Sequence, residues 1–214
     1  MTVVITGASR GIGAGLAAHY QATGQEVFGT GRSAAAQLQL DVNQPASHRA
    51  MAQALGDRAV DLLVCNAGVY LDKGHDLDSG YGADLWAQSF ATNVTGVFLS
   101  IQALMPHLRR AEAGKIAIIS SQMASDNRAP GGSYIYRSSK AAALNLGLNL
   151  AKDLKPEGIA VGIYHPGWVQ TDMGGEAADI TTDEAVNGLA ARFDALSLET
   201  TGCFETWDGR THPF

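Results

Sequence analysis

The stretch Thr2-Val-Val-Ile-Thr-Gly-Ala-Ser-Arg-Gly-Ile-Gly-Ala-Gly-Leu16 decides how this chain is expected to fold. Its first part, Thr2–Thr6, is a run of β-branched residues that predicts a short buried strand. Gly7, Gly11 and Gly13 then indicate a tight turn, after which apolar residues recur at helical spacing. Glycine lets a backbone approach a ligand closely, and a helix N-terminus presents free N–H groups with a partial positive charge. This order of strand, glycine turn and helix therefore predicts a phosphate-binding site.

Two other interpretations of this turn remain open. The simpler one is a tight strand-to-helix connection that binds no ligand. The other is a serine hydrolase, because Gly7-Ala-Ser-Arg-Gly11 fits the Gly-x-Ser-x-Gly pattern around an α/β-hydrolase nucleophile. Only six residues precede the turn, too few for the flanking strands and oxyanion loop of such an enzyme. We therefore expect Ser9 not to be a nucleophile, and labelling of Ser9 by a fluorophosphonate would contradict this.

Composition narrows the class of protein further. A length of 214 residues is typical of one α/β domain with a full core. A net charge of −6 and a pI near 5.4 argue against a general nucleic-acid binder, which would be basic. The sequence has neither a long apolar run nor a signal-peptide pattern, so we expect no membrane span and a cytoplasmic location.

The cysteines and histidines add two expectations. Cys65 and Cys203 each lie in an apolar, strand-like segment, which predicts buried thiols in a reducing compartment and no disulfide framework. The six histidines show no metal-ligand spacing with cysteines or acidic residues, so we predict no metal.

Strands and helices alternate along the whole chain, which predicts a parallel sheet covered by helices on both faces. Few residues join the second and third strands, too few for the crossover helix that parallel strands normally need. Pro106 should kink or end the long helix around it. The expected strands are 2–6, 26–30, 38–42, 60–65, 115–121, 159–164 and 202–206, and the later helices are 46–55, 83–110, 131–154 and 182–196.

The helix over 131–154 carries leucines on all sides. Leu144, Leu146, Leu148 and Leu150 are not confined to one stripe, and a helix that is apolar all round is buried on both faces. We therefore expect a second copy of the chain to cover it in a homodimer or homotetramer.

Two arginines near the glycine turn favour NADP(H). Proteins that bind NAD usually carry an acidic residue about twenty residues after the glycines, where it bonds the ribose 2′-hydroxyl. This chain offers Arg32 in that region, and Arg10 lies in the turn itself. Guanidinium groups fit the oxygens of a 2′-phosphate, so we predict NADP(H), with NAD(H) as the weaker ligand. The alternative is that both arginines are solvated surface residues.

Tyr136 and Lys140 form a candidate acid–base pair. Residues four apart share one face of a helix. A cation beside a phenol stabilises the phenolate, so Lys140 is expected to lower the pKa of Tyr136 from its usual value near 10 and let it transfer a proton. Tyr134 lies at the wrong spacing from Lys140 for this role.

Taken together, these residues resemble the short-chain dehydrogenase/reductase family over nearly the whole chain. The region from His165 to Gly175, with Asp208-Gly209 and Pro213, resembles the smaller carbonyl-reductase-like or C-factor-like branch. The matching pieces stand in the family's order: 6–13, Asp41-Val42, Asn66-Ala67-Gly68, Asn93, Ile119-Ser120-Ser121, Tyr136 with Lys140, and 166–171.

The resemblance implies a single-domain Rossmann-type doubly wound parallel sheet of about seven strands with helices on both faces. It implies one domain over residues 1–214, with a dinucleotide-binding half of about residues 1–110 and a catalytic and substrate half of about 111–214. The implied activity is NADP(H)-dependent hydride transfer between the nicotinamide and a carbonyl or secondary alcohol. The alternative is a non-catalytic NADP(H)-binding regulatory protein, which loss of the tyrosine or the lysine would normally mark.

The resemblance also implies the catalytic roles. Tyr136 would protonate the carbonyl oxygen, and Lys140 would hold the nicotinamide ribose and lower the pKa of Tyr136. Ser121 would orient the carbonyl; it is preferred to Ser120 because the second serine usually acts in this family. Its separation from Tyr136 is slightly longer than usual, which leaves Ser125 as a third candidate. Asn93 would hold a water in a proton relay, or be a helix-interior asparagine bonded to nearby backbone.

The implied cofactor contacts follow the same motifs. Asp41 would bind the adenine amino group, with Val42 beside the ring, and Asn66, Ala67 and Gly68 would run along the adenosine ribose. For Val42 and Val169, simple core packing is the alternative. The other implied contacts are Gly7, Ser9, Arg10, Gly11, Ile12, Gly13, Arg32, Tyr136, Lys140, Pro166, Gly167, Val169 and Thr171.

The segment that forms the substrate lid in this family, Gln170–Thr181, is short here. A short lid predicts an exposed pocket that admits bulky carbonyls, or one that another subunit completes. Aromatic and sulfur side chains are the expected lining: Trp168, Tyr134, Met123 and Met173.

Overall fold

The glycine-rich stretch folds as the sequence predicts. In the computed structural model of the chain, strand β1 (Thr2–Ile5) runs through a turn into helix α1 (Gly11–Ala22). The structure describes residues 1–34 and 36–214. Gly7 and Gly11 have φ values of 68° and 54°, which residues other than glycine adopt only with strain. The backbone of the turn therefore depends on these two glycines.

Within the described residues, seven parallel strands form one sheet in the order β3-β2-β1-β4-β5-β6-β7. This confirms the single-domain, doubly wound sheet. The strand order reverses at β1 and β4, and ligands of such sheets bind at the carboxyl edge beside this point. The other strands are β2 (Glu26–Gly31), β3 (Leu38–Gln39), β4 (Leu62–Cys65), β5 (Lys115–Ile119), β6 (Ala160–His165) and β7 (Phe204–Thr206).

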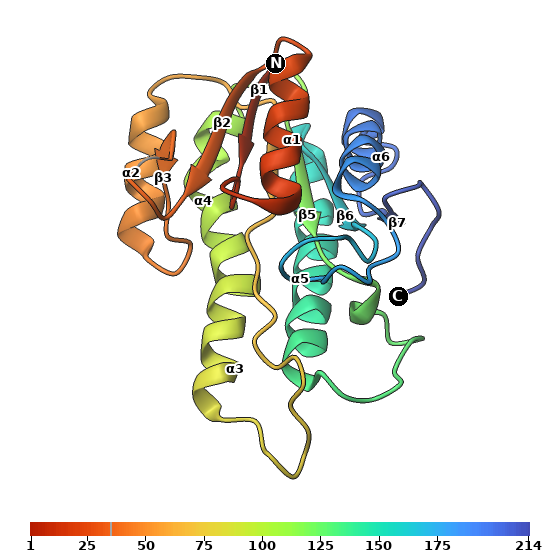
Figure 1. The fold of residues 1–214 in the computed structure, drawn as a ribbon. Helices are drawn as coiled ribbons and strands as arrows, with labels where there is room; N and C mark the ends of the chain where they lie inside the picture. Colours follow the sequence, from red (N-terminus) through yellow and green to blue (C-terminus); the bar gives the residue numbers. More distant parts are fainter. Residues whose placement is uncertain (35) are drawn as a thin grey trace.

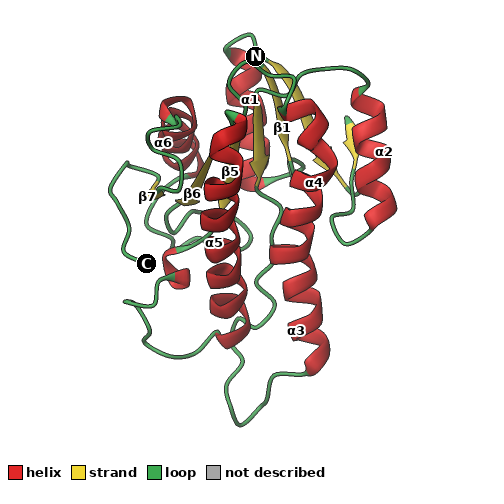
Figure 2. Ribbon diagram, turned by 180° about the vertical axis from the view of Figure 1, so that it is seen from behind, coloured by secondary structure: helices red, strands yellow, loops and turns green. Residues whose placement is uncertain are grey.

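Helices cover both faces of the sheet (Figures 1 and 2). On one face, α1 and α6 pack against Val3 and Ile5; on the other, α2, α4 and α5 pack against a core that includes Val4. Neighbouring β1 side chains thus enter opposite cores, as expected for a strand buried on both sides. The other helices are α2 (Pro45–Leu55), α3 (Ala83–Phe90), α4 (Gly96–Leu108), α5 (Tyr134–Leu154) and α6 (Thr182–Ala195).

The link between β2 and β3 contains no helix among its described residues, as the sequence predicts. The third strand is shorter than the predicted 38–42, because pairing ends at Gln39. The backbone then turns, and the Asp41 N–H donates to the Ser47 hydroxyl at 2.9 Å. A side-chain hydrogen bond thus replaces the strand ladder at this point.

The long helix predicted over 83–110 is divided. α3 and α4 are joined by a π-helical turn, η1 (Ala91–Thr95), and α4 ends at Leu108. Pro106 lies inside α4, and the helix ends directly after it, as expected from the missing N–H. Apolar periodicity carries no signal for the π turn, because the helical path continues through it.

The predicted helix over 131–154 begins later, at Tyr134. Gly131, Gly132 and Ser133 all have positive φ, so the backbone is not helical there. The leucines of α5 find partners within this chain: Leu146 and Leu150 pack against one core cluster, and Leu148 packs beside Leu144 in another. The all-round apolar pattern therefore has an explanation within one chain, and the homo-oligomer stays a prediction.

Helix α6 begins as its sequence predicts. Thr181 and Glu184 form a capping box, in which each side chain accepts from the other residue's backbone N–H.

Cys65 is buried and Cys203 half-buried, and both are free thiols. In the described part of the chain no helix is long and apolar enough to cross a membrane. Across residues 1–34 and 36–214, no cluster of three His, Cys, Asp or Glu side chains is arranged to hold a metal ion. The absence of a metal from the working protein stays a prediction.

Candidate active site

The glycine turn lies at the carboxyl edge of the sheet and is held from the neighbouring strand. The Asn66 amide, directly after β4, donates to the carbonyl oxygens of Thr6 and Gly7 at 3.0 and 3.1 Å. A Cβ at Gly13 would collide with the Gly7 carbonyl, so α1 starts close against the turn. Asn66 was expected along the adenosine ribose, whereas here its amide holds the turn in shape.

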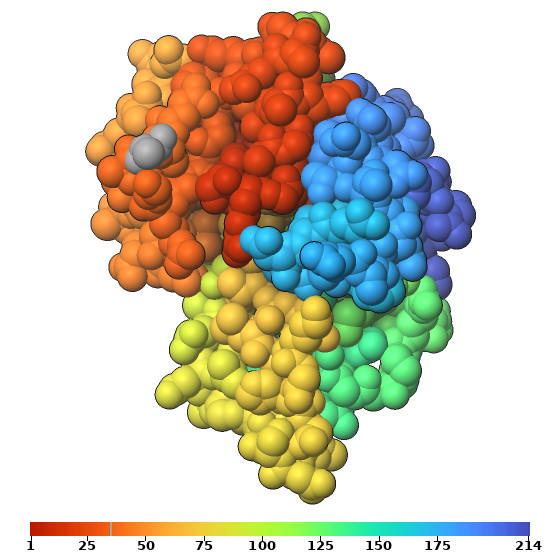
Figure 3. All heavy atoms as spheres, in the orientation of Figure 1, coloured from red at the N-terminus to blue at the C-terminus, as the bar shows by residue number. Residues whose placement is uncertain are grey.

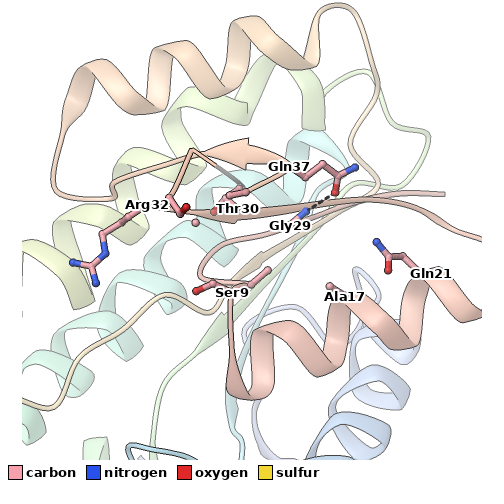
Figure 4. Close-up of a pocket in the computed structure, with 11 residues that line it drawn as sticks. Ser9, Ala17, Gln21, Gly29, Thr30, Arg32 and Gln37 are labelled. Carbon is pink, nitrogen blue, oxygen red and sulfur yellow. Dashed lines mark hydrogen bonds between the residues drawn. The ribbon is translucent and has the colours of Figure 1, made fainter.

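A cavity of about 530 Å³ opens beside this turn, between α1 and the end of β2 (Figure 4). Ser9 and Arg32 line it, together with Thr30, while Ala17 and Gln21 reach it from α1. Gln37 closes one side, where its amide oxygen accepts from the Gly29 N–H at 3.3 Å. The hydroxyl of Ser9 and the guanidinium of Arg32, beside the end of β2, fit a phosphate group. Among the described lining residues no acidic side chain opposes a phosphate.

Arg10 does not lie in this cavity. Its guanidinium instead forms an ion pair with Asp172, across the site. The segment that carries Asp172 folds back over the turn and offers Arg10 an anion. The expected contact of Arg10 with the cofactor stays a prediction.

Tyr136, Ser121 and Lys140 are brought together at the same edge of the sheet. All three side chains are buried, and the Ser121 hydroxyl acts on the Tyr136 phenol by lowering its pKa. The Lys140 Nζ lies 5.7 Å from the centroid of the Tyr136 ring. One turn of α5 therefore carries the phenol and the cation, while the end of β5 carries the hydroxyl.

The pKa of Tyr136 is raised to about 12, mainly because burial disfavours the phenolate. The Ser121 hydrogen bond opposes this shift, whereas the charges of Tyr70 and Asp72 add to it. Burial also lowers the pKa of Lys140 to about 8. The expectation of a lowered tyrosine pKa is thus wrong for this structure: Lys140 donates its Nζ proton to the Ile119 carbonyl at 2.9 Å, and desolvation outweighs its attraction for a phenolate.

The structure distinguishes the candidate serines. Ser120 is buried, and its hydroxyl donates to the Lys140 carbonyl at 2.9 Å, which ties β5 to α5. Ser125 is also buried, and its hydroxyl has no hydrogen-bond partner in the described part of the chain. Of the three, Ser121 alone influences the pKa of the Tyr136 phenol, which favours the preferred candidate.

Asn93 lies in the π turn between α3 and α4, behind Lys140. Its amide donates to the Val69 carbonyl and the Ser139 hydroxyl, both at 2.9 Å, and its oxygen accepts from the Val69 N–H at 2.8 Å. A Cβ at Gly68 would stand 3.3 Å from both the Asn93 oxygen and the Lys140 Nζ. Asn93 therefore both borders the lysine and holds the backbone after β4, and its expected part in a proton relay stays a prediction.

The expected adenine contacts, Asp41 and Val42, lie in a turn held by α2 and the π turn. The Val42 carbonyl bonds the buried His48 ring at 2.9 Å, and the Thr92 hydroxyl donates to the Asn43 side chain at 3.1 Å. Val42 also packs against the core, and burial lowers the pKa of His48. A neutral His48 imidazole can donate this hydrogen bond to the Val42 carbonyl, so His48 links α2 to the turn.

The segment after β6 folds over the glycine turn. Val169 is buried and pairs with Ile180, which favours the core-packing alternative for this residue. Thr171 lies above Gly11, within 3.5 Å of where a Cβ there would stand. Figure 3 shows this segment, in cyan and light blue, against the red glycine turn and the amber loop after β4. The Lys73 ammonium donates to the Met173 carbonyl at 3.3 Å, so two loops meet across the site.

The side chains expected to line the pocket around the short lid are largely accessible. Trp168, Met173 and Tyr134 are exposed, and Met123 is half-buried. The Trp168 indole donates to the Gly174 carbonyl at 2.9 Å, which folds the lid on itself. Exposure of these side chains agrees with an open pocket, and their contact with a substrate stays a prediction.

Two residues at the site were not among the expected ones. The Tyr70 ring stacks on Tyr136 with centroids 4.2 Å apart, and the Asp72 carboxylate is buried against the start of α5. Both follow Asn66-Ala67-Gly68 at the end of β4. The carboxyl ends of parallel strands meet at one edge of the sheet. The position of Tyr70 and Asp72 directly after β4 could therefore have predicted that they lie near the site.

Comparison with known proteins places the fold and site in a family. Residues 1–181 match the sequence profile described as short chain dehydrogenase. The chain is 37% identical over 171 residues to C-signal of Myxococcus xanthus, a match that covers 78% of this chain and 99% of that protein. It is 35% identical over 226 residues to 1-hydroxy-2-glutathionyl-2-methyl-3-butene dehydrogenase of a Rhodococcus strain, covering 97% of both.

Among solved structures, an NADPH-bound carbonyl reductase from chicken fatty liver superposes with a TM-score of 0.91 at 30% identity, over 100% of this chain and 98% of that one. The family match, both relatives and this structure agree on the family and the fold. The chain therefore belongs to the short-chain dehydrogenase family and is an oxidoreductase that resembles its carbonyl-reductase-like branch.

Proposed function

We propose that this protein is an NADP(H)-dependent oxidoreductase that interconverts a carbonyl and a secondary alcohol. The observation that carries the proposal is the buried Tyr136 phenol, which Ser121 influences and the buried Lys140 backs. The dinucleotide-binding residues lie mainly in the part of the chain before residue 110, and the acid–base residues mainly after it. This supports the two functional halves predicted from the sequence.

The chemistry follows from the protonation states. With a pKa of about 12, Tyr136 is neutral at physiological pH and donates a proton to a carbonyl oxygen. Ser121 donates a second hydrogen bond and fixes that oxygen beside the phenol. The bound nicotinamide supplies or accepts the hydride. Lys140 is mostly protonated at pH 7, where its charge stabilises the phenolate left after proton transfer.

Selectivity for NADP(H) rests on Arg32 and Ser9 at the mouth of the cavity beside β2. A guanidinium and a hydroxyl bind phosphate oxygens, and an NAD-type acidic residue is absent from the described lining. NADPH-bound carbonyl reductase as a structural neighbour supports the same ligand. NAD(H) should bind more weakly, because it leaves Arg32 without a phosphate.

Fluorescence titration with NADPH and NADH tests the cofactor. Arg32→Ala should weaken NADPH binding about 10-fold or more and leave NADH binding nearly unchanged, because only NADPH carries the 2′-phosphate. Arg110→Ala is the matched control, since Arg110 pairs with Asp57 outside the cavity. Equal affinity of the unmodified protein for both cofactors would contradict the preference.

Tyr136→Phe tests the reaction on a panel of aldehydes and ketones. Loss of the phenol should lower turnover by about 100-fold or more, with little change in NADPH affinity. A protein that binds NADPH but reduces nothing on the panel would favour the regulatory alternative. Full activity of Tyr136→Phe would place the proton donor elsewhere.

The cytoplasmic location and the homodimer or homotetramer stay predictions. Light scattering of the purified protein measures its mass in solution, and a single-chain mass would contradict the oligomer.

A further inference from the structure

Helix α5, which carries Tyr136 and Lys140, begins without a cap of its own. Its N-cap residue, Ser133, has a φ of 49° and makes no side-chain capping bond. The first N–H groups of a helix have no partners within the helix, and a buried helix end must find acceptors elsewhere. Ile135 and Tyr136 are both buried, so the first turn of α5 needs such acceptors.

Asp72, which is distant in sequence, supplies them. One carboxylate oxygen accepts from the Ile135 N–H at 2.9 Å, and the other accepts from the Tyr136 N–H at 3.2 Å. Asp72 is only 1% exposed, and a buried carboxylate is costly unless it is bonded. Within the described part of the chain it forms no ion pair with a basic side chain. Its charge is therefore stabilised by these N–H groups and the positive end of α5.

The segment that carries Asp72 is fixed at both ends. At Val69, both the N–H and the carbonyl are bonded by the Asn93 side chain. Between them, the Tyr70 ring stacks on Tyr136, with 4.2 Å between centroids and 23° between planes, and its hydroxyl bonds the Ser133 hydroxyl. Residues 69–72 therefore link Asn93 to the backbone and ring of Tyr136.

We propose that Asp72 is a positioning residue for Tyr136: its carboxylate caps the first turn of α5 and thereby holds the phenol against Ser121. Asp72 bonds the backbone of Tyr136 itself, so a shift of this contact moves the phenol directly. The inference rests on the proposed role of Tyr136 as the proton donor. Asp72 acts through the helix and does not touch the reacting atoms.

The charge of Asp72 has a second effect. The titratable groups that face Tyr136 are Tyr70, Asp72 and Lys140, and the negative charge of Asp72 helps to raise the pKa of Tyr136. Removal of that charge should let the phenol ionise at lower pH.

The test compares Asp72→Asn with Asp78→Asn, which removes the same charge from an exposed position of the same loop. Asp72→Asn should lower kcat for carbonyl reduction about 10- to 100-fold, because small displacements of a reacting group are costly. The KM and the Kd for NADPH should stay within about threefold, because the glycine turn is untouched. Asp78→Asn should match the unmodified protein.

Each other outcome is decisive. An unchanged kcat in Asp72→Asn overturns the inference, and so does a loss of NADPH binding equal to the loss of turnover. If Asp72→Asn does not fold, Asp72→Glu keeps the charge at a displaced position. A reduced kcat with an unchanged Kd for NADPH then supports positioning, and an unchanged kcat overturns it. Tyr136→Phe, measured in parallel, separates the two proposals, because full activity there refutes the proton donor itself.

Discussion

At the residue scale, burial moves the pKa values of two neighbouring groups apart. The pKa of Tyr136 rises to about 12 and that of Lys140 falls to about 8, each because the charged form is desolvated. The phenol therefore keeps its proton until a substrate accepts it, while the ammonium lies close to its titration point. Such a site costs folding free energy, since a buried cation with one carbonyl partner is poorly solvated.

Lys140→Met should therefore stabilise the protein while it abolishes turnover. The folded-state pKa of Lys140 is lowered, so the unfolded chain binds its proton more tightly between pH 8 and 10.5. At pH 7 the substitution should raise the free energy of unfolding by on the order of 1–2 kcal/mol, after the lost bond to Ile119 is deducted. The gain should shrink as pH rises through that interval. Urea unfolding at a series of pH values measures this, and destabilisation at pH 7 would contradict it.

At the element scale, β1, the glycine turn and α1 form one unit. The close approach of α1 to the turn shapes the binding surface. Gly13 is buried in α1 and faces the Gly7 carbonyl and the Asn66 amide. The helix can approach the turn only because no Cβ separates them. The N–H groups at the start of α1 thereby come within reach of a phosphate.

Gly13→Ala should break this approach. The new methyl group would meet backbone oxygen, which cannot move as a flexible side chain can, so we expect a loss of about 1–3 kcal/mol in stability and weaker NADPH binding. Gly82→Ala is the control, since a Cβ there meets nothing within 4 Å and its φ is −60°. Thermal unfolding and NADPH titration of both variants measure the effect; equal behaviour would refute the steric argument.

At the scale of the whole molecule, buried tyrosines make the stability of the fold depend on pH in the alkaline range. The Tyr20 hydroxyl of α1 donates to Asp194 of α6 at 3.3 Å, and burial with this carboxylate raises its pKa far above the usual value of 10. Burial likewise raises the pKa of Tyr164 in β6. These residues join helices and sheet on one face of the molecule, so their ionisation opposes the packing of that whole layer.

Stability should therefore fall above pH 10. A raised folded-state pKa contributes stability that is fully present below the unfolded value near 10 and is lost as pH rises beyond it. Tyr20→Phe removes one such group, so the difference between this variant and the unmodified protein should narrow above pH 10. Comparing the two at each pH cancels the opposite contribution of Lys140. A difference that stays constant across the range would show that Tyr20 ionises equally in both states.

The sequence by itself determined the alternation of strands and helices, the glycine turn, the short link between β2 and β3, and the Tyr136–Lys140 pair. These are local properties, because hydrophobic periodicity, glycine conformation and helical spacing are set by residues close in the chain. Only the tertiary structure decided which serine acts on Tyr136, that Arg10 turns to Asp172, and that burial raises the pKa of Tyr136. It also revealed Asp72 at the start of α5. Each depends on segments far apart in sequence that meet at the carboxyl edge of the sheet, where burial and partners are set by packing that local patterns do not encode.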